Sequence, residues 1–341
     1  MRIEVEAVQL DIKHTFKIAR GEKKKCENFI FTVSHEGVTG VGEASPQVYY
    51  GESSDSVRAA VQKLGAAIDG EPADLRRRLL SGDLRSLLHK DPSVRAALDM
   101  ALWDIEGKQA GKPCYELIGL DPAETPVTSF TIGFDLPEVV DKKLEEASAY
   151  PVLKMKMGIP GDMALLDRAL RNSGKTIRVD ANEGWDLDTA LVVGKELADR
   201  GIEFMEQPIS HFRREDLAEL KLLSPLPIIL DESIVNPEDV QLCRDQGHGI
   251  NIKLMKCGGM TPALELIREA RAAGMSIMLG CMIESSIAIT AAAHLSPLVD
   301  YADLDGNLLL ADDPWSGVGV DGGKLVLPAG PGLGVVRRDR G

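Results

Sequence analysis

The chain has 341 residues, which is long enough for one large α/β domain or for two domains of ordinary size. Its net charge is −14 at pH 7, and no basic stretch is interleaved with aromatic residues, so we expect no binding to nucleic acid or to an anionic membrane surface. No apolar run approaches the ~20 residues of a membrane-spanning helix, and the N-terminus lacks the apolar region of a signal peptide. These features predict a soluble, cytoplasmic protein.

The cysteines are odd in number, are scattered along the chain and include no C-x-x-C pair. This pattern favours reduced thiols over a disulfide framework or a zinc site. The five are Cys26, Cys114, Cys243, Cys257 and Cys281.

The first part of the chain changes from strand-like to helical periodicity. Residues 1–45 alternate apolar and polar side chains between glycine turns, which predicts antiparallel strands. Residues 53–118 carry apolar side chains at i, i+3 and i+4, which predicts helices. Strands followed by helices indicate an α+β unit of about 120 residues.

After Pro122 short β-rich runs alternate with helical stretches. Eight such runs, with helical segments between most of them, indicate a barrel of parallel strands. The Gly-rich tail from about residue 313 contains one strand-like run and is expected to return to the N-terminal unit. The eight runs are PVTSFTIG, YPVLKMKMG, KTIRVDAN, GIEFMEQP, LPIILDES, GINIKLMKCGG, GMSIMLGCM and DYADLDGN.

Three successive runs end in an acid: Asp180, Glu206 and Asp231. In a parallel barrel the strand ends meet on one face, so these carboxylates would converge there. A single acid at this place is usually a helix cap or a surface charge, but three at regular spacing suit a hard divalent cation. We expect Mg²⁺, with Mn²⁺ as a possible substitute.

Lys154 and Lys156 lie two apart in a strand and therefore on the same face, which points into the barrel. A solvated edge strand is the alternative for such a pair by itself. Mutual repulsion and burial would lower the lysine pKa values towards the range of a base near neutral pH. Lys253 ends the sixth run, roughly across the barrel from the second, so two bases could approach one carbon from opposite faces.

This set of groups suits the removal of a proton next to a carboxylate. Such a proton is too weakly acidic to leave unless the charge that develops on the carboxylate oxygens is stabilised, which a bound divalent cation achieves. Removal from one face and return to the other inverts the carbon.

With these motifs the whole chain resembles the enolase superfamily, and within it the muconate lactonizing enzyme subgroup. The resemblance rests on the segment AALDMALWDIEGKQAGKPCYELIG (96–119) and on KMKMG, VDAN, MEQP, LDES and NIKLMKCGG. It implies a modified (β/α)₇β TIM-like barrel with an α+β capping domain formed by the N-terminal segment and the C-terminal tail. We accordingly expect a capping domain over 1–122, a barrel over 123–312 and a segment over 313–341 that completes the capping domain.

The resemblance also implies residue roles. Asp180, Glu206 and Asp231 match metal ligands, and Lys156 and Lys253 match two bases that act through a metal-stabilised enolate. Lys154 would tune Lys156 and contact the substrate carboxylate. Lys256 is the alternative to Lys253, but the motif places the base at the first lysine of NIKLMK.

Asp303 and Asp305 lie two apart at the end of the eighth run. They are either turn-forming acids before Gly306 or a paired seat for an ammonium group. The D-x-D pattern resembles that of the dipeptide epimerases, where it holds the α-ammonium of the substrate. We therefore expect a small-molecule dipeptide as the ligand, and a homo-oligomer as the assembly.

The side chains that set specificity are predicted from the loop 19–28 and from strand ends. The basic loop suits a glutamate side chain, which favours L-Ala-D/L-Glu as substrate; solvated lysines are the alternative. Tyr49 and Tyr50 belong to a second capping loop or to domain packing. Further candidates for substrate binding are Arg20, Lys23, Lys24, Ser129, Thr131 and Glu284.

Three alternatives stay open. The enzyme could epimerise hydrophobic or cationic dipeptides. It could instead be a cycloisomerase, an o-succinylbenzoate synthase or an N-acylamino-acid racemase, although these substrates lack the free amine that Asp303 and Asp305 suit. A non-catalytic barrel that binds a metal or a peptide is the third.

Overall fold

The computed structural model describes residues 1–338, and its N-terminal part is an antiparallel sheet covered by helices. The sheet has the order β1-β2-β3, and the helix α4 packs against β3. The elements are β1 (Arg2–Ile18), β2 (Gly21–His35), β3 (Val38–Ala44), η1 (Val48–Tyr50), α1 (Ser54–Leu64), η2 (Gly65–Ala67), α2 (Pro72–Ser81), α3 (Asp83–Leu87), α4 (Pro92–Ala110), α5 (Cys114–Ile118) and η3 (Pro122–Glu124).

Two glycines allow β3 and α4 to approach closely. A Cβ atom at Gly40 or Gly42 would collide with the backbone carbonyl of Ala101 or Ala97 on the helix. Glycine at these positions lets backbone meet backbone, which larger residues would prevent. The predicted change from strands to helices is confirmed.

The described residues after 125 form one eight-stranded parallel sheet in the order β4 to β11. A parallel bridge between Thr128 and Ala302 joins the two edges and nearly closes the barrel. The strands are β4 (Phe130–Ile132), β5 (Val152–Lys156), β6 (Thr176–Asp180), β7 (Met205–Glu206), β8 (Ile228–Leu230), β9 (Gly249–Lys253), β10 (Ser276–Gly280) and β11 (Tyr301–Asp303). Each of the eight predicted runs thus contains a strand.

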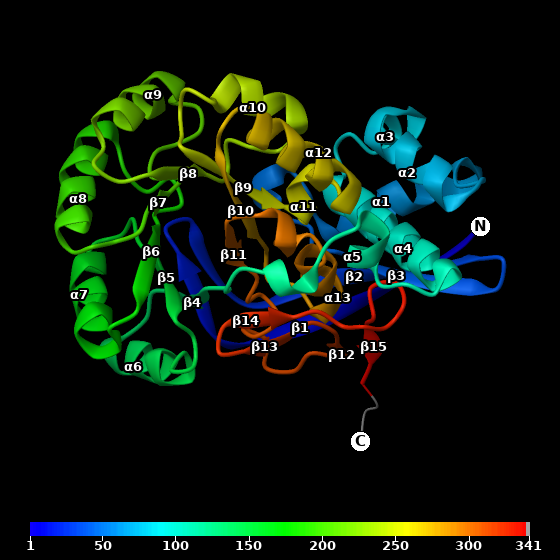
Figure 1. The fold of residues 1–341 in the computed structure, drawn as a ribbon, viewed down its shortest axis with the longest axis horizontal. Coiled ribbons are helices and arrows are strands. Elements are labelled where there is room, and N and C mark those ends of the chain that lie inside the picture. Colours follow the sequence, from blue (N-terminus) through cyan, green and yellow to red (C-terminus); the bar gives the residue numbers. More distant parts are fainter. Residues whose placement is uncertain (339–341) are drawn as a thin grey trace.

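Helices follow the first seven of these strands in the described part of the chain and surround the barrel (Figure 1). They are α6 (Pro137–Glu146), α7 (Asp162–Ser173), α8 (Leu187–Asp199), α9 (Arg214–Leu223), α10 (Pro237–Cys243), the short α11 (Leu254–Cys257), α12 (Met260–Ala272) and α13 (Ser286–Ala293), followed by η4 (Ser296–Leu298). The predicted (β/α)₇β barrel with an α+β unit is confirmed.

The tail returns along the N-terminal part, as Figure 1 shows for its red and blue segments. The backbone amide of Cys114 donates to the carbonyl of Gly332, and that of Leu333 donates to Asp104 on α4. These contacts support the proposed grouping of the tail with the N-terminal segment. The tail strands are β12 (Trp315–Ser316), β13 (Gly319–Asp321), β14 (Lys324–Val326) and β15 (Val336–Arg337).

Strand alternation decides which side chains reach the barrel interior. On β5 the apolar Leu153 and Met155 are fully or almost fully buried in the hydrophobic core, as is Met157 just beyond the strand. The alternate residues Lys154 and Lys156 face the site, as the period of two predicts. Among the described residues no helix is long and apolar enough to cross a membrane.

Candidate active site

A cavity of about 430 Å³ lies where the barrel strands end and is covered by the N-terminal segment. This volume is in the range of small-molecule sites. Barrel residues and capping residues both line it, so the site depends on how the two parts meet. The lining includes Phe16, Ile18, Arg20, Lys23, Gln47, Tyr49, Tyr50, Thr131, Lys154, Lys156, Asn182, Asp231, Glu232, Lys253, Cys281, Met282, Ile283, Asp303 and Asp305.

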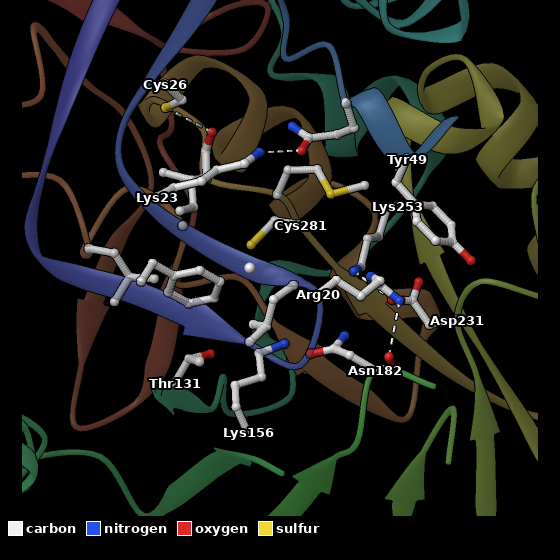
Figure 2. Close-up of a pocket in the computed structure, with 18 of the residues that line it drawn as sticks. Arg20, Lys23, Cys26, Tyr49, Thr131, Lys156, Asn182, Asp231, Lys253 and Cys281 are labelled. Atoms are coloured by element: carbon white, nitrogen blue, oxygen red, sulfur yellow. Dashed lines mark hydrogen bonds and ion pairs between the residues drawn. The ribbon is translucent and has the colours of Figure 1, made fainter. Parts of the chain in front are cut away.

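Lys156 and Lys253 lie on strands β5 and β9, which are separated by three strands in either direction around the barrel. Figure 2 shows both side chains projecting into the cavity from different sides. Lys156 Nζ lies 2.6 Å from Asp180 Oδ2, and Lys253 Nζ lies 2.7 Å from Asp231 Oδ2. The predicted opposed placement is therefore present in the structure.

Lys256, the alternative to Lys253, points elsewhere. It is buried, and its ammonium donates to Asp231 Oδ1 and to the carbonyl of Asn251. Since the lining of the cavity includes Lys253 and not Lys256, the geometry favours Lys253 as the group that meets a ligand.

The three predicted metal ligands end adjacent strands. Strand register places Lys156, Asp180 and Glu206 beside one another on β5, β6 and β7, and Asp231 follows β8 directly. All three carboxylates are buried, with at most 1% of their surface exposed. Each is close to a lysine, because Lys154 lies 2.7 Å from Glu206 Oε2 and 3.2 Å from Asp180 Oδ2.

These residues fit a hard divalent cation. Burying three carboxylates is costly unless cations offset them, and carboxylate oxygens are the ligands that Mg²⁺ prefers. Glu206 Oε1 accepts a hydrogen bond from Asn251, whereas its buried Oε2 meets, among the described residues, only the Lys154 ammonium, which also contacts Asp180 and Asp303. An incompletely satisfied oxygen among acids is what a bound cation would engage.

The lysine pKa values depart from the prediction. Burial alone would lower the pKa of Lys154, but the carboxylates of Asp303, Glu206 and Asp180 outweigh it and raise this pKa well above its usual value. Burial likewise opposes charge on Lys253, whose pKa is nevertheless raised, chiefly by Asp231. The prediction of a lowered pKa was wrong for Lys154, because the carboxylates of Asp303, Glu206 and Asp180 all lie within 3.2 Å of its ammonium.

The pKa values of the three predicted metal ligands shift in two directions. Burial opposes ionisation of Asp180 and Asp231, but their lysine partners outweigh it and lower both pKa values. Burial and the neighbouring Asp180 raise the pKa of Glu206 to about 7. Glu206 therefore differs from the other two acids, whose lysine partners keep them ionised.

Asp303 ends β11, Asp305 follows it, and both line the cavity. Asp303 accepts hydrogen bonds from Lys154 at 2.7 Å and from the Ser129 hydroxyl, while Asp305 accepts one from the Thr131 amide at 2.6 Å. Burial and Asp303 raise the pKa of Asp305 to about 7, whereas Lys154 outweighs burial and lowers the pKa of Asp303. Both acids line the cavity, as predicted, and so does Thr131. Ser129 is not part of the lining, and its hydroxyl donates a hydrogen bond to Asp303 instead.

The capping residues differ in how they meet the cavity. Arg20 is held by carboxylates, with Nη2 2.5 Å from Glu232 Oε1 and Nη1 3.3 Å from Glu183 Oε2. The exposed Lys23 donates to Gln47 Oε1 at 2.8 Å and has no ion pair within the described residues. Lys24, also a candidate, is exposed and is not part of the lining.

Glu284 does not reach the cavity surface formed by the described residues. Its Oε1 accepts a hydrogen bond from the Met282 amide at 2.9 Å. Burial and the nearby Glu43 raise the pKa of Glu284 to about 8. Glu284 therefore lies behind the cavity wall, where it would not contact a ligand directly.

Several residues of the site were not predicted. Glu183 and Glu232 bind Arg20, and Asn251 binds Glu206. Asn251 lies two residues before Lys253 on the same strand, so the period of two could have indicated it. Glu183 lies in the turn after β6, where no periodic signal exists.

Comparison with known proteins identifies the class. A model described as the N-terminal domain of mandelate racemase / muconate lactonizing enzyme matches residues 2–119, and one described as enolase C-terminal domain-like matches residues 138–340. The chain therefore belongs to the mandelate racemase and muconate lactonizing enzyme family of the enolase superfamily, as its motifs predicted.

Individual relatives of known activity cover nearly the whole chain. It is 40% identical over 339 residues to the L-Ala-D/L-Glu epimerase of Bacteroides thetaiotaomicron, covering 99% of this chain and 88% of the relative. It is 39% identical to the L-Ala-D/L-amino acid epimerase of Pedosphaera parvula, covering 97% of each chain. These relatives confirm the prediction of an isomerase of the racemase and epimerase class.

A solved relative adds a bound state. The dipeptide epimerase from Methylococcus capsulatus, complexed with Mg and the dipeptide L-Arg-D-Lys, superposes with a TM-score of 0.87 at 33% identity. The match covers 98% of this chain and 99% of that one.

Proposed function

We propose that this chain is a Mg²⁺-dependent dipeptide epimerase that inverts the α-carbon of the C-terminal residue. The observation that carries the proposal is the placement of Lys156 and Lys253 on opposite strands, with one group of acids at the ends of β6, β7 and β8 and a second group at the end of β11. A dipeptide has an anionic and a cationic end, and the two groups of acids suit those ends differently.

The carboxylate end would lie towards Asp180, Glu206 and Asp231. A divalent cation held by these residues supplies stabilisation of the negative charge on the substrate carboxylate. The solved relative contains both Mg and a dipeptide, which supports a metal ion in a site of this kind. Lys154, which lies between Glu206 and Asp303, would add positive charge beside the substrate.

The amino end would lie at Asp303 and Asp305. Both are buried and acidic, and Asp303 already has the cation Lys154 on its Oδ2, so the pair is partly neutralised. A substrate ammonium would supply the remaining positive charge and pair with two carboxylates. Substrates without a free amine, such as N-acylated amino acids, would bring no positive charge to pair with these two acids.

The reaction would use the two lysines in turn. A neutral lysine on one face would take the α-proton, and the ammonium of the other would give a proton to the opposite face. The raised pKa of Lys253 favours the ammonium form, which suits the donor role, and neutralising Asp231 with a cation would reduce the effect that raises it.

The second residue of the dipeptide is proposed to be glutamate, giving L-Ala-D/L-Glu as the substrate. Lys23 is a cation on the cavity wall without a carboxylate partner in the described part of the chain, and the Bacteroides relative acts on this dipeptide. The apolar wall formed by Phe16, Ile18 and Ile283 keeps a hydrophobic second residue as the alternative.

The test is α-deuterium exchange. The protein would be incubated in D₂O with Mg²⁺ and a panel of L-Ala-X dipeptides, and both epimers would be analysed by mass spectrometry. We expect deuterium at the α-carbon of the second residue in both epimers. Absence of exchange from every dipeptide in the panel would refute the proposed function.

A further inference from the structure

A barrel carboxylate, Glu183, contacts both capping segments that cover the cavity. Its Oε2 accepts a hydrogen bond from the Tyr49 hydroxyl at 2.6 Å and lies 3.3 Å from Arg20 Nη1. Arg20 is at the turn between β1 and β2, and Tyr49 is in η1. The two capping segments are distant in sequence and meet at one oxygen atom.

The other oxygen of Glu183 is bound to the barrel. Oε1 accepts a hydrogen bond from the His211 amide at 2.8 Å, and His211 Nδ1 lies 2.7 Å from it. The Glu183 amide also donates to the carbonyl of Gln207 at 2.8 Å. The carboxylate is therefore fixed on its barrel side and presents its second oxygen to the capping segments.

The backbone at this place is strained. Glu183 has a φ of 65°, and Asn182 before it has a φ of 46°, so two successive residues occupy the left-handed region. Glutamate rarely adopts this conformation, and such strain persists where the surrounding structure requires it. Asn182 also contributes its carbonyl to Arg20 Nη1, at 3.2 Å (Figure 2).

Arg20 and Tyr49 support one another above this carboxylate. The Arg20 guanidinium lies 4.3 Å from the centre of the Tyr49 ring, which is a cation–π contact. Arg20 also neutralises Glu232, which is fully buried beside Asp231. With two carboxylates already on Arg20, a substrate carboxylate placed there would find little unneutralised charge.

From this arrangement we propose that Glu183 is a positioning residue that latches the two capping segments onto the barrel. The latch holds the roof of the cavity, which is the segments around Arg20 and Tyr49, against the barrel. This inference rests on the proposed function for its kinetic consequence, but the latch itself can be observed without substrate.

The substrate-free experiment is limited proteolysis. Lys23, Lys24 and Lys25 are exposed on the strand that follows the turn at Arg20, so trypsin can cut there when the segment leaves the barrel. In Glu183→Ala we expect cleavage at residues 20–25 to rise about tenfold, located by mass spectrometry. Glu238→Gln is the matched control, because it removes an exposed ion pair between Arg85 on α3 and Glu238 on α10, away from the cavity. Its cleavage should equal that of the unmodified protein.

A double-mutant cycle tests whether Glu183 and Tyr49 act together. Tyr49→Phe removes only the hydroxyl, which contacts Glu183 and also His211 Nδ1 at 3.1 Å, and adding it to Glu183→Ala should increase cleavage by less than it does in the unmodified protein. Glu183→Gly relieves the left-handed strain while removing the latch, so faster cleavage without a lower melting temperature would separate latching from stability. Additive effects, or unchanged cleavage in Glu183→Ala, would overturn the proposal.

The kinetic experiment uses α-deuterium exchange. In Glu183→Ala we expect KM to rise about tenfold with a smaller change in kcat, and Glu183→Gln to recover part of the loss because it keeps an acceptor for Tyr49. A raised KM without faster cleavage would also contradict the latch. If the unmodified protein turns over no dipeptide, the proposed function fails, and the cleavage rates still decide on the latch.

Discussion

Lys154 lies 2.7 Å from Asp303, an ion pair that joins strand β5 to strand β11. The same ammonium lies 2.7 Å from Glu206, so one buried cation connects the predicted metal ligands with the acids of β11. Through Lys154, a change of charge at Asp303 therefore affects Glu206, and a change at Glu206 affects Asp303.

Replacing either proposed base should abolish epimerisation. For Lys156→Ala and for Lys253→Ala we expect a loss of about 10³-fold in epimerisation, the size typical of removing an acid–base group. Each variant should still exchange the α-proton of the one epimer that faces the remaining lysine, measured by NMR in D₂O. The exposed Lys324→Ala is the control. Exchange from both epimers in either variant would contradict the two-base mechanism.

Removing the metal should remove activity. We expect chelation to abolish deuterium exchange and added Mg²⁺ to restore it. In the absence of substrate, Mg²⁺ should raise the melting temperature, and Glu206→Gln should require at least ~10-fold more Mg²⁺ for the same rise. Activity that survives exhaustive chelation would count against Asp180, Glu206 and Asp231 as a metal site.

The substrate amine should matter through Asp303 and Asp305. Acetylating the amine of the dipeptide should abolish turnover, since the acetylated nitrogen carries no positive charge to pair with the two acids. Asp303→Asn should lower kcat/KM by about 10- to 100-fold, as expected for one hydrogen bond to a charged group. Equal rates for the free and the acetylated dipeptide would refute the role of this pair as an ammonium seat.

Lys23 should discriminate between charged and neutral second residues. In Lys23→Met we expect the preference for L-Ala-L-Glu over L-Ala-L-Gln to fall about tenfold, because the two substrates have nearly the same shape and differ in the charge that Lys23 would pair with. Lys24→Met, outside the cavity lining, is the matched control. An unchanged preference would remove Lys23 from the specificity site and favour the hydrophobic alternative.

Glu284 should make stability depend on pH. Its pKa is raised from 4.5 to about 8 by burial and by Glu43, so the folded state holds this proton more tightly than the unfolded state does. The associated stability is fully present below pH 4.5 and is lost as the pH rises through about 8. Glu284→Gln should therefore melt at a higher temperature than the unmodified protein at pH 9, with a smaller difference at pH 5. Identical melting curves across this range would contradict the raised pKa.

Much of the site follows from local patterns. Asp180, Glu206 and Asp231 end strands that alternate with helices, and strand ends in a parallel barrel share one face. Lys154 and Lys156 share a face because strand side chains alternate. These features depend on residues close in sequence, which is why periodicity and spacing could predict them.

The sequence by itself thus determined the barrel and the set of acids and lysines at its strand ends. Only the tertiary structure decided their partners, because a pKa depends on distances between residues far apart in sequence. Lys154 and Asp303 are 149 positions apart, and their contact reverses the predicted shift of the lysine pKa. Arg20 and Glu183 are 163 positions apart, and no spacing rule predicts that a strained turn after β6 would hold the roof of the cavity.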